Sequence, residues 1–144
     1  MIEQDTIRLL RECDAGVKMG VSSISDVLGS VEDKTMHALL SKSQKAHEAL
    51  QSSIQSALDR FGDEGKSPNP MASVMSTVKT NMELMMKPTD ATIASLMTDG
   101  CNMGVKSLSK YLNEYAAADE SAKDVCKKLI ALEEQLAKDL RGYL

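Results

Sequence analysis

The sequence predicts an all-α protein, an antiparallel four-helix bundle with a long crossover connection that carries a short extra helix. Apolar residues recur at steps of three and four through most of the chain, which is the spacing of amphipathic helices. Seven residues that begin at Met19 (M-G-V-S-S-I-S) return 84 positions later at Met103 as M-G-V-K-S-L-S. One loop rich in Gly and Pro, residues 62–70, separates the two halves. We therefore expect residues 1–144 to form one domain that uses a helical hairpin twice.

The first hairpin is predicted to hold helices over residues 6–29 and 31–61. Asp5 is the expected N-cap of the first helix, and Ser30, with an acidic residue three positions later, resembles a capping box for the second. Both helices carry an apolar seam, formed by Ile7, Leu10, Val17, Val21, Ile24 and Leu28 and by Met36, Leu40, Leu50, Ile54, Leu58 and Phe61.

The second hairpin is predicted to hold helices over residues 91–117 and 120–143, after a break at Pro88 to Asp90. The short links inside each hairpin require antiparallel neighbours. The link over residues 62–89 is much longer and contains a predicted methionine-rich helix, residues 71–86. At about 1.5 Å per residue, that helix covers roughly 25 Å, so the link can travel the length of a bundle.

The composition suits helices and excludes some partners. Aromatic residues make up 3% of the chain, with ten Met, one Phe and no Trp, and such a core favours helices over sheets. The net charge of −4 is spread evenly, so nucleic acid is an unexpected partner. No apolar run approaches the roughly 18 residues that span a bilayer, and we expect no membrane partner.

The cysteines indicate a reducing compartment. Cys13, Cys101 and Cys126 are odd in number and have no C-x-x-C spacing, which argues against disulfides and zinc knuckles. Each lies on or beside an apolar helix face, so we expect small buried hydrophobic side chains. Together with the charged N-terminus, this predicts a cytoplasmic protein.

The two repeated hairpins are joined by a long crossover. Asp14 lies on the first helix, His47 on the second, and Asp99-Gly100 within the third. In these features and in its helix lengths, the chain resembles the ferritin-like superfamily. The chain is most similar to a small bacterial four-helix-bundle family of unknown function. In metal-binding members of the superfamily, each half supplies a carboxylate from its first helix and a Glu-x-x-His pair from its second. The resemblance thus implies a place in the bundle interior where a di-metal site would lie.

The first half keeps part of that ligand set. Asp14 is in step with the apolar seam and is predicted to point inward, as the first carboxylate of a di-metal site should. His47 is also predicted to point inward. Its partner three residues earlier is Gln44, a neutral amide that cannot bridge two metal ions as a carboxylate does.

The second half keeps less of the set. The shift of 84 matches Asp14 with Thr98, and Asp99 is turned toward solvent. A shift of 90 overlays the second helices and matches His47 with Ala137 and Gln44 with Glu134, which tilts away from the seam. Glu133 instead is predicted to point inward.

We therefore expect a non-enzymatic bundle with a degenerate di-metal site, a structural or interaction role and no cofactor. The alternative is an oxidoreductase or metal store that binds iron, manganese or zinc through Asp14, His47 and Glu133, with Asp99 and Glu134 assisting. A buried Asp14–His47 hydrogen bond without any metal is a third reading of these residues.

Three further expectations concern surfaces and packing. The methionine face of the predicted crossover helix could line a groove for a ligand or partner, and a homodimer through this helix or the bundle is expected. His37 is predicted to be solvated. Gly20 and Gly104 lie inside helices, where we expect them to permit close helix approach.

Overall fold

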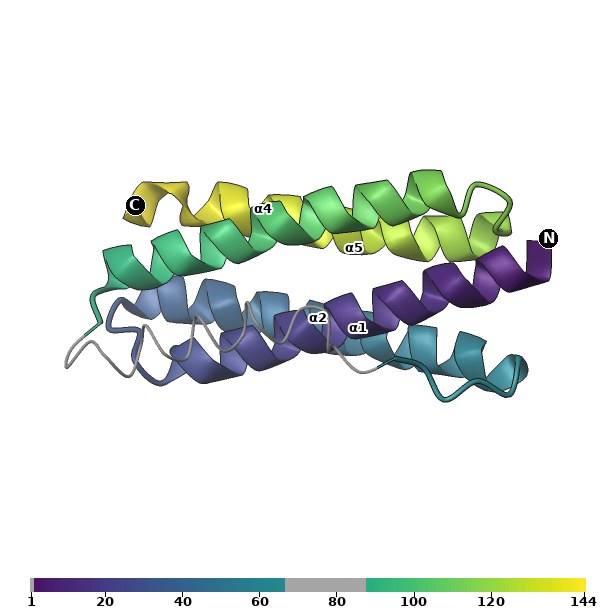
Figure 1. The fold of residues 1–144 in the computed structure, drawn as a ribbon. Coiled ribbons are helices and arrows are strands. Elements are labelled where there is room, and N and C mark those ends of the chain that lie inside the picture. The colour runs from purple at the N-terminus through teal and green to yellow at the C-terminus, as the bar shows by residue number, and fades with distance from the viewer. Residues whose placement is uncertain (1, 67–87) are drawn as a thin grey trace.

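The computed structural model describes residues 2–66 and 88–144 and shows, within these ranges, four long helices packed together and no strand (Figure 1). The elements are α1 (Ile2–Leu28), α2 (Lys34–Arg60), α4 (Asp90–Glu114), α5 (Glu120–Leu140) and the short 3-10 helix η2 (Arg141–Tyr143). The predicted all-α bundle is confirmed. The predicted helix over residues 71–86, with its methionine face, lies outside the described residues.

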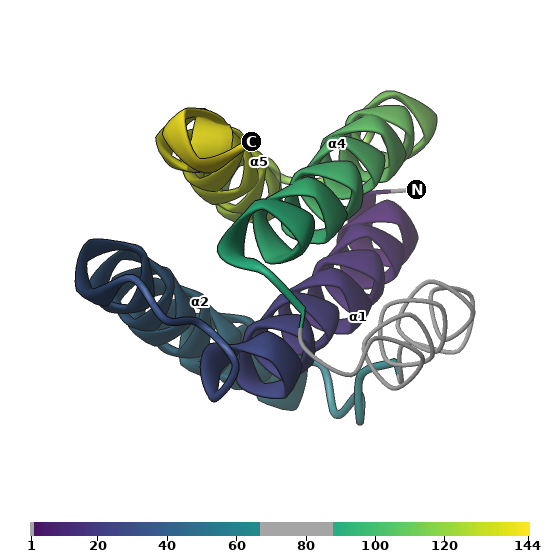
Figure 2. The same ribbon diagram turned by 90° about the vertical axis from the view of Figure 1, so that its left-hand side faces the viewer.

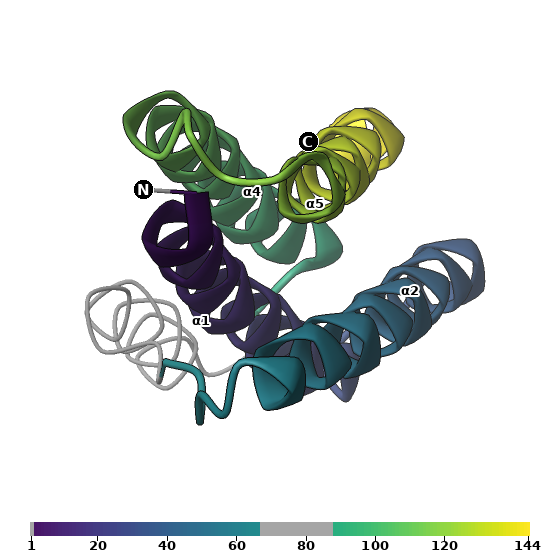
Figure 3. The same ribbon diagram turned by 90° about the vertical axis from the view of Figure 1, so that its right-hand side faces the viewer.

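The four helices form two antiparallel hairpins, α1 with α2 and α4 with α5 (Figure 1). Helices α2 and α4 run in the same direction, so α2 ends and α4 begins at opposite ends of the bundle. Seen end-on, α1 lies beside α4 and α2 beside α5, while α1 and α5 also contact each other across the bundle (Figures 2 and 3). The link between the hairpins therefore has to connect the two ends of the bundle.

Two predicted boundaries in the first hairpin are wrong. Helix α1 begins at Ile2, one turn before the predicted start, and Asp5 lies inside it rather than at its N-cap. The N-cap of α2 is Asp33 and not Ser30, because the Asp33 carboxylate accepts the Met36 backbone N–H at 2.8 Å. Phe61 was predicted in the apolar seam, but it follows the end of α2 and is 39% exposed.

In the second hairpin the predicted starts are close and the predicted ends are too late. Thr89 caps α4 and Asp119 caps α5, each through a side-chain oxygen that accepts a backbone N–H of the first turn. Helix α4 ends at Glu114, and α5 ends at Leu140 because the chain tightens there into η2.

Each hairpin is fastened to the other at its turn. The Asp33 backbone N–H donates to the Asp90 carboxylate at 2.9 Å, and the Asp119 backbone N–H donates to the Thr6 hydroxyl at 2.8 Å. Asp33 and Asp119 are the N-caps of α2 and α5, whereas Thr6 and Asp90 lie near the starts of α1 and α4. The first helix of each hairpin thus binds the turn of the other hairpin.

The buried residues confirm the repeat between α1 and α4, the first helices of the two hairpins. They correct the overlay that the sequence predicted for α2 and α5, the second helices. A shift of 84 superposes buried residues of α1 on buried residues of α4: Leu9 on Ile93, Leu10 on Ala94, Cys13 on Met97, Val17 on Cys101 and Ile24 on Leu108. For α2 and α5 the burial pattern repeats at 86, and not at the predicted 90: Met36 on Ala122, Leu40 on Cys126, His47 on Glu133 and Ile54 on Leu140. His47 therefore corresponds to Glu133 and not to Ala137.

The bundle interior consists of two apolar clusters with a polar layer between them. One cluster includes Leu10, Val17, Leu58 and Leu129, and the other includes Ile24, Leu40, Met97 and Leu136. Between the clusters each helix contributes one residue to the polar layer: Gly20, His47, Gly104 and Glu133. None of the described helices combines the length and the apolarity that crossing a membrane requires.

Candidate functional site

The centre of the polar layer is a hydrogen bond between His47 of α2 and Glu133 of α5. Their Nε2 and Oε1 atoms lie 2.8 Å apart. His47 is fully buried and Glu133 is 8% exposed. Both residues point inward, as the sequence predicted, and the structure shows in addition that they are each other's partner.

The hydrogen bonds fix the number of protons in this pair. His47 Nδ1 lies 2.7 Å from the Ser43 carbonyl oxygen, which can only accept, so Nδ1 carries a proton. The other bond needs one further proton between Nε2 and Oε1, either on the imidazole or on the carboxyl group. The pair as a whole is therefore neutral in both forms.

The surroundings of His47 favour the protonated ring. Burial disfavours the charge, but the hydrogen bond to Glu133, the charge of Glu133 and the Ser43 carbonyl together raise the pKa of His47. The shared proton is therefore favoured on the ring, and the pair is enclosed between the two apolar clusters.

Gly20 and Gly104 make room for this pair. A methyl group on the Gly20 Cα would lie 2.7 Å from His47 Cδ2, closer than packed carbon atoms come. The same group on Gly104 would lie 3.7 Å from the Glu133 carboxylate, in ordinary contact. We predicted close helix approach at these glycines, and the structure shows that they accommodate side chains from α2 and α5.

Cys101 lies beside Glu133 in the same region. Burial, the charge of Glu133 and a hydrogen bond to that carboxylate raise the pKa of the Cys101 thiol well above its ordinary value. The thiol is therefore protonated and a poor nucleophile at neutral pH. Burial is confirmed for all three cysteines, which are free thiols.

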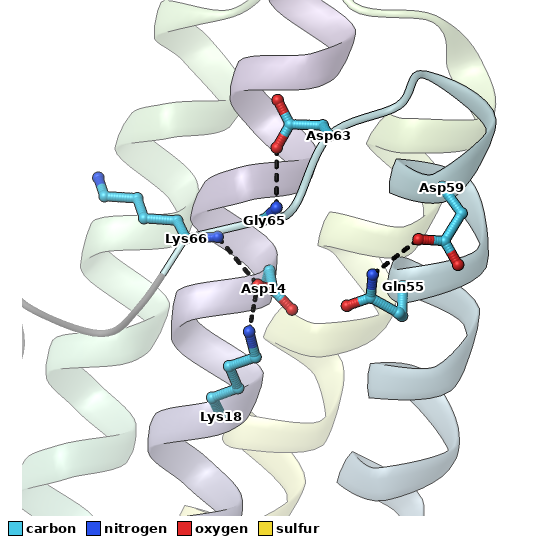
Figure 4. A network of polar contacts seen from close by, with 7 residues as sticks. All are labelled: Asp14, Lys18, Gln55, Asp59, Asp63, Gly65 and Lys66. Atoms are coloured by element: carbon cyan, nitrogen blue, oxygen red, sulfur yellow. Dashed lines mark hydrogen bonds and ion pairs between the residues drawn. The ribbon is translucent and has the colours of Figure 1, made fainter.

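Asp14 is buried as predicted, but its partners are different from those expected. Its Oδ2 accepts from Lys18 Nζ at 2.7 Å and from the Lys66 backbone N–H at 3.0 Å (Figure 4). Gly65, with φ at +86°, lies directly against this oxygen. Asp14 thus holds the chain that leaves α2, and its hydrogen bond is not to His47.

The predicted ligands do not form one metal site. Among residues 2–66 and 88–144, no three His, Cys, Asp or Glu side chains are grouped so that they could hold a metal ion. Asp99 and Glu134, the weaker candidates, are exposed, as is His37. The structure brings together His47 and Glu133 only.

Sequence reasoning missed two features of the site. The Ser43 carbonyl, which fixes the His47 ring, gives no signal because every residue carries such a group. The second missed feature is a further glycine on each of two helices. Gly16 lies four residues before Gly20, and Gly100 lies four residues before Gly104. All four glycines line a cavity beside Glu133. The repeat of this Gly-x-x-x-Gly spacing in both halves was the signal that could have revealed the cavity.

Comparison of the chain with protein-family models, with curated proteins and with solved structures found no match. The functional argument therefore depends on the geometry of the bundle interior.

Proposed function

We propose that this chain is a ferritin-like bundle in which a buried His–Glu ion pair stands where a di-metal centre would lie, and that its role is structural or interactive. The ferritin-like assignment is supported by two antiparallel hairpins whose second and third long helices run in the same direction (Figure 1). Up-down-up-down bundles, by contrast, alternate direction at every helix.

The observation that carries the proposal is the use of both ring nitrogens of His47. Nδ1 donates to Ser43 and Nε2 pairs with Glu133, so neither nitrogen presents a lone pair to a metal ion. Asp14, the carboxylate that should complete a site, is bound to Lys18 and Lys66. A di-metal centre wants about four carboxylates and two histidines, and these residues do not fit one.

Elemental analysis of the full chain, purified without chelators and then incubated with iron(II), manganese(II) or zinc(II), tests the proposal. We expect substoichiometric metal and no iron(II) oxidation above the rate in buffer. About one or two equivalents of metal that His47→Ala abolishes would overturn the proposal, and the metal-dependent oxidoreductase or store would replace it. His37→Ala is the matched control, because this exposed histidine reports only on metal bound at the surface.

The interaction role has its own readout. We expect the chain to form a homodimer, and light scattering coupled to size-exclusion chromatography measures its mass directly. A chain that stays monomeric at all concentrations would contradict self-association. The proposed role would then be binding of a different partner or a purely structural one.

A further inference from the structure

A groove runs along the outside of the bundle between α2 and α5, which lie side by side in both end-on views (Figures 2 and 3). Leu50 and Leu132 are the largest apolar side chains in its lining, and both are partly exposed. The other lining residues are Ala46, Ala49, Ser53, Lys128, Ala131 and Gln135. A mainly apolar groove on the surface is a candidate for contact with another protein.

Charged side chains lie beyond both ends of the groove. Steps of four and seven residues keep to one face of a helix. Continued from the groove in such steps, the face of α2 reaches Lys42 and Arg60, and the face of α5 reaches Asp124 and Asp139. All four are exposed, and no ion pair joins any of them to another of the described residues. Helix α2 thus offers two positive charges to this face, and α5 offers two negative charges.

The His47–Glu133 bond gives the level of these charges along the bundle, because it places one residue of α2 beside one of α5. The two helices are antiparallel, so the start of α2 lies level with the end of α5 (Figure 1). Lys42 is five residues from His47, and Asp139 is six residues from Glu133 in the same direction along the bundle. Lys42 and Asp139 therefore lie at one level.

The other end of the groove has the same arrangement. Arg60 is thirteen residues beyond His47, and Asp124 is nine residues before Glu133. The difference of four residues corresponds to about 6 Å along the helix axis, which a long arginine side chain can span. Each end of the groove therefore has a positive charge on α2 and a negative charge on α5.

Two copies of the chain can meet across this face about a twofold axis in two orientations. If the axis crosses the helices, α2 meets α2, so that Lys42 lies against the partner's Arg60 and Asp124 against the partner's Asp139. If the axis runs along the bundle, α2 meets α5, so that Lys42 lies against the partner's Asp139 and Arg60 against the partner's Asp124. Like charges meet in the first orientation and opposite charges in the second, so the second is favoured.

We propose that the partner for this face is a second copy of the chain, with α2 of each copy against α5 of the other. Leu50 and Leu132 of both copies form the apolar centre of the interface, and the charges at the two ends fix the orientation. Lys128, the charged residue of the lining, then lies near the partner's Ser53 and meets no like charge. The assignment rests on the proposed interactive role and names its surface and its partner.

Charge reversal tests the orientation, with the Kd of the dimer measured by sedimentation equilibrium at low salt. Arg60→Glu puts a carboxylate against the partner's Asp124 at both symmetric contacts, and we expect the Kd to rise about tenfold. Adding Asp124→Lys should restore the wild-type Kd. In the other orientation Arg60→Glu would remove a repulsion from the partner's Lys42, so a lower Kd would overturn the proposal, as would a double variant that stays weak.

Lys110→Glu is the matched control, because it changes the net charge by the same amount at an exposed residue of α4 outside the groove. It should leave the Kd unchanged. Equal weakening by Arg60→Glu and Lys110→Glu would assign the effect to net charge and overturn the proposed surface. A dimer that neither reversal affects would also overturn the surface while self-association stands, whereas a chain that is monomeric at all concentrations would overturn both.

Discussion

His47 and Glu133 are bonded across the antiparallel helices α2 and α5 and are equivalent positions of the two hairpins. They lie 86 residues apart, the same separation as Lys34 and Glu120, the first residues of the two helices. Two antiparallel helices related by a twofold repeat meet at equivalent positions. The duplication therefore brings one residue of each copy to the centre of the bundle, a histidine from the first copy and a glutamate from the second.

The two echoed glycines should respond differently to alanine. Gly20→Ala is expected to lower the free energy of unfolding by about 1–3 kcal/mol, because the fully buried His47 ring is held on both nitrogens and cannot move away. Gly104→Ala meets only ordinary contacts and should raise it by up to about 1 kcal/mol, since alanine favours the helix. Urea unfolding followed by circular dichroism measures both, and equal effects would contradict this account of the polar layer.

Breaking the His47–Glu133 pair should cost more than removing it entirely. Glu133→Leu alone leaves the His47 ring without its partner and is expected to lower the free energy of unfolding by about 3–5 kcal/mol. The double variant His47→Leu with Glu133→Leu replaces both groups by apolar ones and should lose much less, or even gain stability. A double variant as unstable as the sum of the single variants would contradict the ion pair. Chemical unfolding of all four proteins completes the cycle.

Stability should fall as the pH rises above neutrality. Because the pKa of His47 is raised in the folded protein, the folded state holds more protons than the unfolded state above the unfolded pKa, about 6.5. The stabilisation is complete below that pH and is lost as the pH passes through the folded pKa. Two other ionisable side chains lie at this pair: Glu133 contacts the His47 ring, and Cys101 lies beside Glu133. Measurements between about pH 6 and 8 stay below the ordinary pKa of thiols, so the Cys101 thiol does not titrate in this range.

Unfolding curves across this range should show the slope in wild type and lose it in His47→Gln. His37→Gln, a change at the exposed histidine, should keep the slope. A slope that survives in His47→Gln would assign the pH dependence to another group.

Gly65 should be much less tolerant of alanine than Gly62. Both have positive φ, +86° and +66°, so each substitution is expected to cost about 1–2 kcal/mol in backbone strain. At Gly65 the added methyl group also meets Asp14, which is held by Lys18 and Lys66, and this should cost about 1–3 kcal/mol more. Nothing lies within 4 Å at Gly62. Equal losses in thermal unfolding would show that Asp14 does not hold the chain after α2.

The helices, their duplication and the inward direction of Asp14, His47 and Glu133 could be predicted from the sequence, because a period of 3.6 residues fixes which way a side chain points from its own helix. Asp99 and His37 were placed at the surface by the same reasoning, and the structure agrees. Capping was harder, since several acidic and hydroxyl residues compete near each helix start, and Asp33 rather than Ser30 takes that role in α2.

The sequence by itself therefore determined an all-α bundle made from one hairpin used twice, with three polar side chains directed into it. Only the tertiary structure decided which of them meet. Periodicity gives a direction around a helix axis, but the level along the bundle depends on the register between helices that are far apart in the chain. Packing of the two apolar clusters and the bonds that Thr6 and Asp90 make to the opposite turns set that register. It places His47 at the level of Glu133, between Gly20 and Gly104, and leaves Asp14 to Lys18 and Lys66.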